Sequence, residues 1–233
     1  MNYNNKIIHG DCLEVMDKMI KEGVKVDAII TDPPYGMNYK SNRRVKRDKF
    51  KHLLNDNNTE IISLSFSKIN ELLKENSSVF IFCSWHKVDK FKIEFEKYWK
   101  LKNILVWEKN NHGTGDLMGS YAPKHEFVLF GEKGRHKRAE KSKRRSDVLK
   151  YNKVLSSELL HPTEKPINML EDFMADYTEE NEIIIDPFAG SGTTAIAAIN
   201  TNRKFICIEK DEEYFNIAQE RIDRALIDKH IYK

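Results

Sequence analysis

The chain has 233 residues, of which 32% are charged and 40% are hydrophobic, and its formal net charge is +3. This length is enough for a substantial core in one α/β domain. No apolar run approaches the roughly 18 residues that span a bilayer. The first ten residues have neither the basic nor the apolar part of a secretory signal. We therefore expect a cytoplasmic protein with no membrane segment. The net charge alone is too small to indicate a polyanionic partner.

The cysteines and histidines show no metal-binding arrangement. Cys12, Cys83 and Cys207 lie far apart without metal-ligand spacing, and the eight histidines form no ligand-like cluster. Reduced thiols that pack inside the protein are the usual state of such cysteines in the cytoplasm. We therefore predict no metal.

The amino-terminal part predicts a strand, a helix and a second strand. Lys6–His9 reads as a strand that leads into Gly10-Asp11-Cys12. Apolar residues at helical spacing then run from Leu13 to about Glu22. Val26–Thr31 is a short apolar run rich in β-branched residues, which predicts a buried strand.

Asp32-Pro33-Pro34-Tyr35 ends this second strand. Proline fixes φ and donates no backbone hydrogen bond, so two consecutive prolines cannot continue a sheet. The turn presents a carboxylate, two stiff carbonyls and an aromatic ring at the carboxyl end of a strand, where open α/β sheets bind ligands. A surface turn is the alternative for a lone Asp-Pro, but the full block after a buried strand is much more specific.

The middle of the chain continues the alternation of helices and strands. The predicted helices are Ile61–Leu73 and Val88–Trp99, and the predicted strands are Val79–Cys83, Ile104–Trp107 and Phe127–Phe130. The last two strands are separated by the loop from Asn110 to Ala122, which has no helical pattern, so we expect them to be antiparallel.

Two segments are strongly basic. Asn38 to Asn58 is polar and basic, and a solvated loop or helix face is its simplest interpretation. Lys133 to Lys153 carries ten Lys and Arg against two acids, a net +8 in 21 residues. The second segment is either a disordered, solvated loop or a segment that contacts phosphates.

The carboxyl-terminal part follows His161-Pro162-Thr163-Glu164-Lys165-Pro166. It predicts a helix through Met169, Leu170, Phe173 and Tyr177, a strand at Glu182–Asp186, a helix at Thr193–Asn200, a strand at Phe205–Glu209 and a closing helix at Tyr214–Leu226.

A glycine-rich turn, Asp186-Pro187-Phe188-Ala189-Gly190-Ser191-Gly192, joins a predicted strand to a predicted helix. Glycines there let the backbone approach a ligand closely, and the helix amino terminus offers free N–H groups. Glu209 follows Gly190 by 19 residues, where an acid typically takes ribose hydroxyls. The spacing also fits a loose dinucleotide fingerprint, so a nicotinamide-dependent oxidoreductase has to be considered. The carboxylate and phenyl ring before the glycines, and the lack of a hydride-transfer acid or base, favour another adenosine ligand.

Four blocks together resemble the β group of amino-methylating DNA methyltransferases. They are Gly10-Asp11-Cys12-Leu13, Thr31-Asp32-Pro33-Pro34-Tyr35, the His161–Pro166 block and Asp186–Thr194. The resemblance covers about residues 6 to 225 and implies a single Rossmann-like domain over residues 1–233. Its sheet would be mostly parallel, with seven strands, one of them antiparallel, and a circularly permuted motif order. The first strand would lie beside the last. The turn Asp32–Tyr35 and the glycine-rich turn, which we call the two signature turns, would meet at the sheet's switch point. Residues 133–160 would form a short target-recognition region.

The resemblance also implies the cofactor and the site residues. The methyl donor would be S-adenosyl-L-methionine. The implied catalytic residues are Asp32, Pro33, Pro34 and Tyr35. The implied cofactor-binding residues are Asp11, Cys12, Asp32, Thr163, Lys165, Asp186, Pro187, Phe188, Ala189, Gly190, Ser191, Gly192, Thr193, Glu209 and Lys210. The basic residues assigned to DNA are Arg43, Arg44, Lys46, Arg47, Lys49, Lys137, Arg138, Lys143, Arg144 and Arg145.

The implied function is methylation of adenine N6 in double-stranded DNA. Asp rather than Ser at the start of the catalytic block favours adenine within this family, and cytosine N4 is the alternative. The target base would have to be flipped out of the duplex, because its amino group cannot be reached inside it. A catalytically idle DNA-binding module would not need both turns intact. The sequence leaves open whether the chain forms a homodimer.

Overall fold

A computed structural model of the chain describes residues 2–35, 60–113, 117–140, 142–154, 160–161 and 164–231. Some predicted site residues lie outside these ranges, namely Arg43, Arg44, Lys46, Arg47, Lys49 and Thr163.

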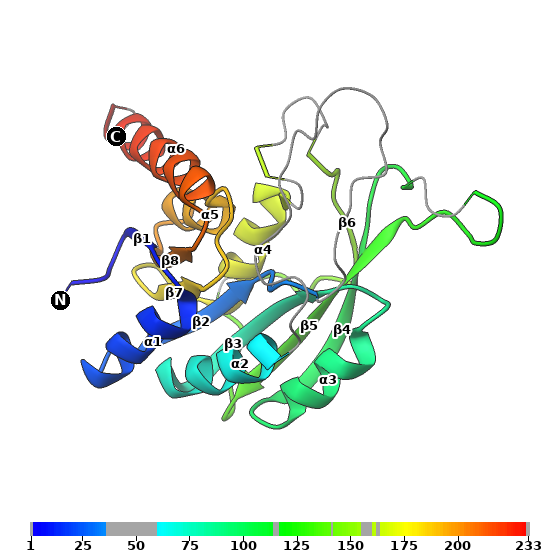
Figure 1. The fold of residues 1–233 in the computed structure, drawn as a ribbon, viewed down its shortest axis with the longest axis horizontal. Helices are drawn as coiled ribbons and strands as arrows, with labels where there is room; N and C mark the ends of the chain where they lie inside the picture. Colours follow the sequence, from blue (N-terminus) through cyan, green and yellow to red (C-terminus); the bar gives the residue numbers. More distant parts are fainter. Residues whose placement is uncertain are drawn as a thin grey trace.

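The described strands form one continuous mixed sheet (Figure 1). In chain order they are β1 (Lys6–His9), β2 (Val26–Thr31), β3 (Leu73–Cys83), β4 (Lys100–Glu108), β5 (His125–Lys133), β6 (Val148–Lys150), β7 (Ile183–Asp186) and β8 (Lys204–Glu209). Their order in space is β1-β8-β7-β2-β3-β5-β4-β6. All neighbouring strands are parallel except for the two pairs that β5 makes with β3 and β4. The predicted mostly parallel sheet with one antiparallel strand is confirmed, as is the pairing of the first strand with the last.

The predicted number of seven strands is wrong, because β6 is an eighth strand inside the basic segment. It has three residues and pairs in parallel with the end of β4. Only Leu149 is buried, between exposed Val148 and Lys150. One buried residue does not make a recognisable strand pattern in a sequence. Pairing with the neighbouring strand β4 therefore determines this element.

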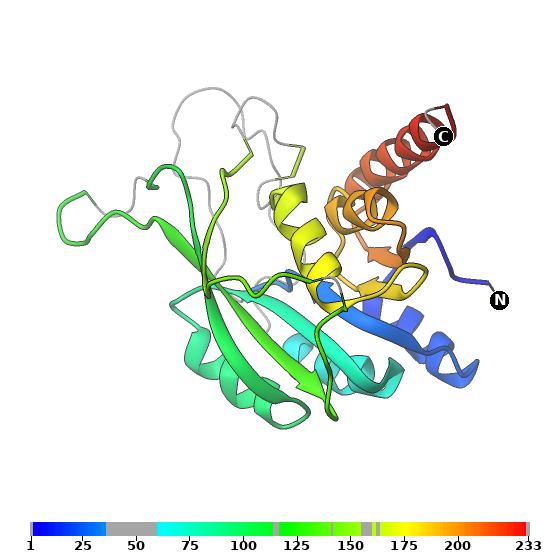
Figure 2. The ribbon, with the colours of Figure 1, turned by 180° about the vertical axis from the view of Figure 1, so that it is seen from behind.

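Helices cover both faces of the sheet (Figures 1 and 2). They are α1 (Cys12–Lys21), α2 (Glu60–Leu72), α3 (Val88–Glu96), α4 (Ile167–Tyr177), α5 (Thr193–Asn200) and α6 (Glu212–Ile231). Met16, Phe66 and Phe95 of α1 to α3 belong to one core, and Phe173 of α4 and Ile222 of α6 belong to the core on the other face. The central strands are buried on both faces, which explains why they appear in the sequence as continuous apolar runs.

The two signature turns leave adjacent strands, β2 and β7. The chain returns from β2 to β3 through α2 on one face and from β7 to β8 through α5 on the other face. This reversal makes the carboxyl ends of β2 and β7 the topological switch point, where open α/β sheets bind ligands. The predicted meeting of the two turns at this point is confirmed, and with it the permuted order of the halves.

The basic segment after β5 starts at the opposite edge of the sheet. Because β5 is antiparallel, its last residue Lys133 lies beside Ser77 near the start of β3. The segment then contacts the carboxyl end of α4, where Ala139 N–H donates to the Asp176 carbonyl at 2.8 Å. The residues before β6 therefore begin far from the turn that follows Thr31.

We predict that Gly192→Ala destabilises the fold more than Gly23→Ala. Both glycines have left-handed backbone, with φ of 81° and 69°. A Cβ on Gly23 would meet nothing within 4 Å, whereas a Cβ on Gly192 would lie 2.9 Å from the Ala218 Cβ. The left-handed conformation alone costs about 1–2 kcal/mol for an L residue, and the overpacking against α6 adds about 1–3 kcal/mol. Urea unfolding of both variants measures the difference, and equal losses of stability would contradict close packing at Gly192.

Candidate active site

Four sequence blocks converge at the carboxyl edge of the parallel strands. Gly10 N–H donates to the Glu209 carbonyl at 3.0 Å, which joins the end of β1 to the end of β8. A Cβ on Gly190 would lie 3.2 Å from the His161 ring, so the block before α4 lies against the glycine-rich turn. Lys165 from the same block reaches Asp32 at 2.6 Å. Residues far apart in the chain thus form one site.

Asp186 connects the two signature turns. Its Oδ1 accepts a hydrogen bond from the Thr31 hydroxyl at 2.6 Å, and its Oδ2 accepts one from the Thr194 hydroxyl at 2.5 Å. The Phe188 N–H donates to Oδ1 at 3.1 Å and closes the turn. Burial raises the pKa of Asp186 to about 6, although the hydroxyls of Thr194 and Thr31 offset part of that effect. Both oxygens bond within the chain, so this carboxylate positions the turns.

Asp32 lies in a buried cluster of charges. Lys165 Nζ is 2.6 Å from Asp32 Oδ2 and 3.1 Å from Glu126 Oε2, and the Lys165 side chain is only 7% exposed. The Tyr35 hydroxyl donates to Asp32 Oδ1. Lys109 pairs with Glu126 at 2.5 Å. The carboxylate therefore has a fixed orientation and a counterion.

Burial and mutual charge set the protonation of this cluster. Burial raises the pKa of the Asp32 carboxyl and Glu126 adds to that, while Lys165 and Tyr35 offset part of the rise. Burial alone would lower the pKa of Lys165, but Asp32 and Glu126 outweigh it and raise that pKa. Burial also raises the pKa of Glu126, but Lys165 and Lys109 outweigh it and lower that pKa to about 2. The lysine is thus held charged between two carboxylates.

Tyr35 is positioned by its ring and its hydroxyl. The ring packs edge-on against Phe91 of α3, with centroids 5.9 Å apart. Burial, followed by the charge of Asp32, raises the pKa of the Tyr35 phenol well above its ordinary value. The hydroxyl therefore remains the donor and Asp32 the acceptor, and the ring keeps one orientation beside the carboxylate.

The glycine-rich turn is held from α6 as well as from β2. Arg221 donates to the carbonyl of Ser191 at 2.7 Å and to its hydroxyl at 2.9 Å. The same guanidinium pairs with Glu164 at 2.9 Å. Arg221 thereby joins the turn to the block before α4. Ser191, Gly192 and the start of α5 are buried, which leaves half-buried Phe188 as the most accessible side chain of the turn.

The ends of β1 and β8 carry the predicted ribose and adenine contacts. Glu209 accepts the Gly190 N–H at 2.7 Å and the Asp211 N–H at 2.8 Å. Asp11 caps α1 by accepting the Leu13 N–H at 2.9 Å and pairs with Lys210 at the same distance. A carboxylate has about four acceptor positions, so these bonds leave room for a ligand hydroxyl.

Most predicted site residues are therefore brought together, but two contributors are missing from the predicted set. Glu126 is the second residue of antiparallel β5, so it starts at the edge where the parallel strands end. The sequence signal that could have indicated Glu126 is an acidic residue near the start of an apolar strand. Arg221 lies in the middle of α6, and nothing in its neighbours distinguishes it from a surface arginine.

The basic residues assigned to DNA are less uniform. Arg145 pairs with Asp172 and Asp176 of α4, each at 2.6 Å, so its guanidinium already has partners within the chain. The other four in this segment are exposed, namely Lys137, Arg138, Lys143 and Arg144. Their contact with DNA stays a prediction.

Within the described ranges, no group of three His, Cys, Asp or Glu side chains is arranged to hold a metal ion. In the same ranges no helix is long and apolar enough to cross a membrane. Cys12, Cys83 and Cys207 are buried and form no disulfide.

The fold and the two joined turns define a Rossmann-like α/β protein. Its glycine-rich turn lies beside the turn Asp32-Pro33-Pro34-Tyr35, which we call the acidic turn. Residues 26–220 match the model of a DNA methylase family, and the chain belongs to that family. It is 30% identical over 255 residues to the type II methyltransferase M2.DpnII of Streptococcus pneumoniae, covering 95% of this chain and 92% of the relative. It is 28% identical over 255 residues to the DNA adenine methyltransferase YhdJ of Escherichia coli, covering 96% and 84%. The crystal structure of an M1.HpyAVI–SAM complex is 28% identical, with a TM-score of 0.73 and coverage of 93% and 98%.

We predict that Lys165→Met strongly destabilises the protein at neutral pH, because it leaves two buried carboxylates facing each other. Removing one member of a buried ion pair typically costs about 3–5 kcal/mol. The loss should be largest at about pH 8 and smaller near pH 5, because Asp32 without its counterion has a raised pKa and takes up a proton in the folded state. Urea unfolding at both pH values measures it.

Lys210→Met is the matched control. Its ion pair with Asp11 is 2.9 Å long, and the two side chains are 46% and 24% exposed. Such pairs contribute about 0–1 kcal/mol. Equal losses for the two variants would contradict the role of burial at Lys165.

Proposed function

We propose that this chain transfers the methyl group of S-adenosyl-L-methionine to the N6 amino group of an adenine in double-stranded DNA. One observation carries the proposal: the Thr31–Asp186 hydrogen bond of 2.6 Å joins the acidic turn to the glycine-rich turn at the switch point of the sheet. Two reactants that bind these two turns would meet at this junction. We take the whole chain as one methyltransferase domain.

The glycine-rich turn suits the methyl donor, which would supply an electrophilic methyl group on a sulfonium. Gly190 and Gly192 have left-handed backbone that only glycine adopts readily, and they allow close approach of a ligand. Phe188 and the carboxylate of Glu209 flank them. A contact between Lys165 and the donor's methionine carboxylate stays a prediction. The Lys165 ammonium already faces the carboxylates of Asp32 and Glu126.

The acidic turn suits an aromatic amine, whose lone pair is delocalised into its ring and therefore weakly nucleophilic. We expect Asp32 and the Pro33 carbonyl to accept the two amino hydrogens, which would favour a pyramidal nitrogen and direct its lone pair toward the methyl group. Positioning and preorganised acceptors near the growing positive charge would supply most of the acceleration. Asp32 would supply the negative charge beside the amine on which positive charge develops, while Lys165 and Lys109 balance the two carboxylates of the cluster.

The target base has to leave the duplex before it can reach Asp32, at a cost of a few kcal/mol. Tyr35 offers a ring face for stacking, and stacking of this kind contributes about 1–3 kcal/mol. Its ring is fixed by Phe91 and by Asp32, so little conformational entropy is lost when a base arrives. We expect Tyr35→Ala to keep donor binding and to lose most turnover.

Adenine is the preferred base for two reasons. Asp opens the acidic turn, as in the adenine-methylating members that the sequence resembles, and the relative YhdJ is a DNA adenine methyltransferase. Cytosine N4 is chemically similar and is the second candidate. A nicotinamide oxidoreductase finds no support, since the chain belongs to the DNA methylase family. An idle DNA-binding module is disfavoured because both turns are complete.

The decisive experiment identifies the methylated base. Purified protein is incubated with plasmid DNA and labelled donor, the DNA is digested to nucleosides, and the product is identified by mass. We expect label in N6-methyladenine. N4-methylcytosine would establish the second candidate, and the absence of label in DNA would refute the proposal.

Asp32→Ala tests the mechanism. We expect turnover to fall by at least about a hundredfold, because a preorganised acceptor is lost. Equilibrium binding of the donor and a cooperative unfolding transition serve as controls for an intact fold. Wild-type turnover in this variant would remove Asp32 from the chemistry.

The pH dependence of turnover should report the raised pKa of Asp32. The carboxylate is the active form, so the rate should fall on the acid side at a pH above the ordinary aspartate value of about 4. Glu126→Gln removes a negative charge that raises the pKa of Asp32, and so this acid limb should move to lower pH. Rates measured from about pH 5 to 9 provide the test, and a limb that stays in place or moves upward would contradict the coupling.

A further inference from the structure

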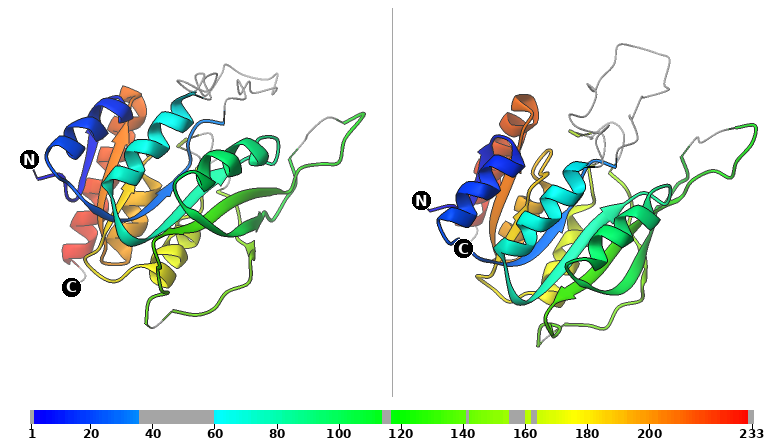
Figure 3. Two further views of the ribbon diagram at one scale, coloured as in Figure 1. Left: turned by 90° about the horizontal axis from the view of Figure 1, so that it is seen from below. Right: turned by 60° about the horizontal axis from the view of Figure 1, so that its bottom comes forward.

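Between β4 and β5 the chain leaves the sheet as an arm, which we define as residues 109–113 and 117–124. Two backbone hydrogen bonds hold its sides together, from Lys109 N–H to the Lys124 carbonyl at 2.9 Å and from Gly113 N–H to the Pro123 carbonyl at 2.7 Å. Figure 3 shows the arm extending outward, beyond the end of the sheet, in both views. The arm thus continues outward from the ends of the antiparallel strands β4 and β5.

Residues 117–121 of the arm, which we call its tip, carry exposed apolar side chains. Among the described residues, the three most exposed large hydrophobic side chains are Tyr121 at 100%, Met118 at 96% and Leu117 at 81%. The next is Ile93 at 63%, on a different element. Single exposed apolar residues are common, but a group of them on one projecting loop indicates an interaction site.

The root of the arm lies beside the acidic turn. Glu126 is the second residue after the arm, and its carboxylate is 3.1 Å from Lys165 Nζ. That ammonium is 2.6 Å from the Asp32 carboxylate. Glu126 is thus separated from Asp32 by one lysine, and the arm leaves from the same edge of the sheet. A duplex that presents a base to Asp32 would therefore approach the root of the arm.

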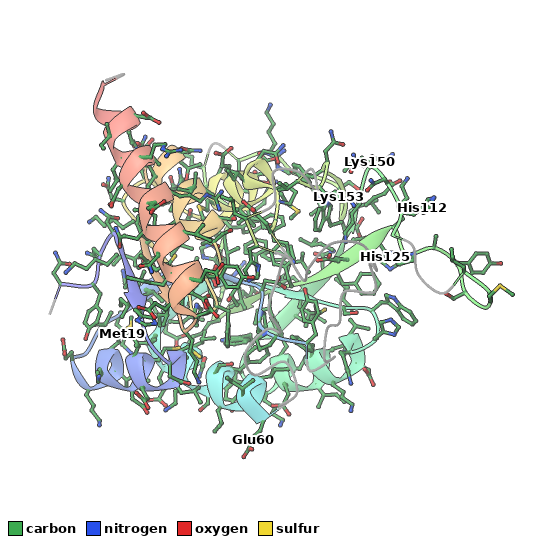
Figure 4. The ribbon with its side chains drawn as sticks, turned by 45° about the horizontal axis from the view of Figure 1, so that its top comes forward. Met19, Glu60, His112, His125, Lys150 and Lys153 are labelled. Carbon is green, nitrogen blue, oxygen red and sulfur yellow. The ribbon has the colours of Figure 1, made fainter. Side chains whose placement is uncertain are left out.

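Positive charge gathers around the base of the arm. Lys124 is half-exposed and pairs with Glu108 at 2.8 Å, and Lys150 is 79% exposed and lies 3.7 Å from the same carboxylate. The two lysines and this one acid leave a net charge of +1. The Lys153 N–H donates to the Asn110 side chain at 3.2 Å, which places it next to the arm. Figure 4 shows Lys150 and Lys153 in the same region as His112 and His125. An apolar tip above a cationic base suits double-stranded DNA, which is a polyanion with stacked bases inside. A second copy of this chain suits it less well, because that copy also carries a net positive charge of +3.

We propose that this arm contacts the DNA duplex, with Lys124, Lys150 and Lys153 at phosphates and Tyr121 inserted into the base stack where the target nucleotide has left. The inference rests on the proposed function and deepens it. An everted base leaves a gap between its neighbours, and apolar side chains are the usual wedges at unstacked steps. A tyrosine ring can stack on the exposed faces, and Leu117 adds apolar contact.

The ring of Tyr121 is tested by comparing Tyr121→Ala with Tyr121→Phe. We expect the alanine variant to lose about tenfold or more in kcat/KM on duplex plasmid, the usual scale of base–aromatic stacking. The phenylalanine variant should keep wild-type turnover. Donor affinity and unfolding temperature should be unchanged in both, since Tyr121 is fully exposed. Ile227→Ala on α6, an exposed residue of another element, is the matched control and should have no effect.

The lysines are tested by the binding of a fluorescently labelled duplex over a range of salt concentrations. Lys150→Gln with Lys153→Gln should lower the slope of log affinity against log salt by about one for each lysine. Lys18→Gln with Lys21→Gln removes the same charge from the exposed last turn of α1, and should leave the slope unchanged.

Wild-type turnover in Tyr121→Ala together with an unchanged salt slope in the Lys150 and Lys153 variant would overturn the inference. So would conversion of a dimer to monomers by Tyr121→Ala, because the tip would then be a self-association surface. Absence of methylation by the wild-type chain would instead refute the proposed function, and the duplex-binding comparison would still decide whether the arm contacts DNA.

Discussion

The hydrogen bond between the Thr31 hydroxyl and Asp186 is the contact on which the site depends. It joins the ends of two adjacent parallel strands, β2 and β7, whose turns carry different chemistry. Asp186 also accepts from Thr194 and from the Phe188 N–H, so one buried carboxylate sets the acidic turn, the glycine-rich turn and the first turn of α5. Such a fully bonded group is rigid, and rigidity of this kind is what placing two reactants within bonding distance requires.

The second requirement is a negative charge that survives burial. A lone carboxylate at the position of Asp32 would take up a proton, because desolvation disfavours its charged form. Lys165 opposes that tendency, because its positive charge lowers the pKa of Asp32. Glu126 shares the ammonium and has Lys109 as a second counterion. Its negative charge raises the pKa of Asp32, so Lys165 and the Tyr35 hydroxyl are the neighbours that favour the charged form.

The sequence predicted those parts of the fold that local patterns encode. Continuous apolar runs located the central strands, and the two prolines after Thr31 and the glycines at 190 and 192 located the turns. It did not reveal β6, whose only buried residue is Leu149, because its pairing comes from β4. It also missed Glu126 and Arg221, which act through partners that are distant in the chain. These contacts depend on the direction of β5 and the rotation of α6, and no short pattern records either.

The placement of positive charge shows why counting charges along a chain misleads. The segment after β5 has the largest excess of lysine and arginine, yet it starts at the edge of the sheet opposite Asp32, and Arg145 is paired with two acids of α4. Within this segment, a lysine arrives at the carboxyl edge at β6, where Lys150 lies opposite the end of β4. In the proposed reaction, phosphates near a base at Asp32 would face the charges at that edge. The direction of each strand, more than the number of cations, therefore decides which lysines can serve the site.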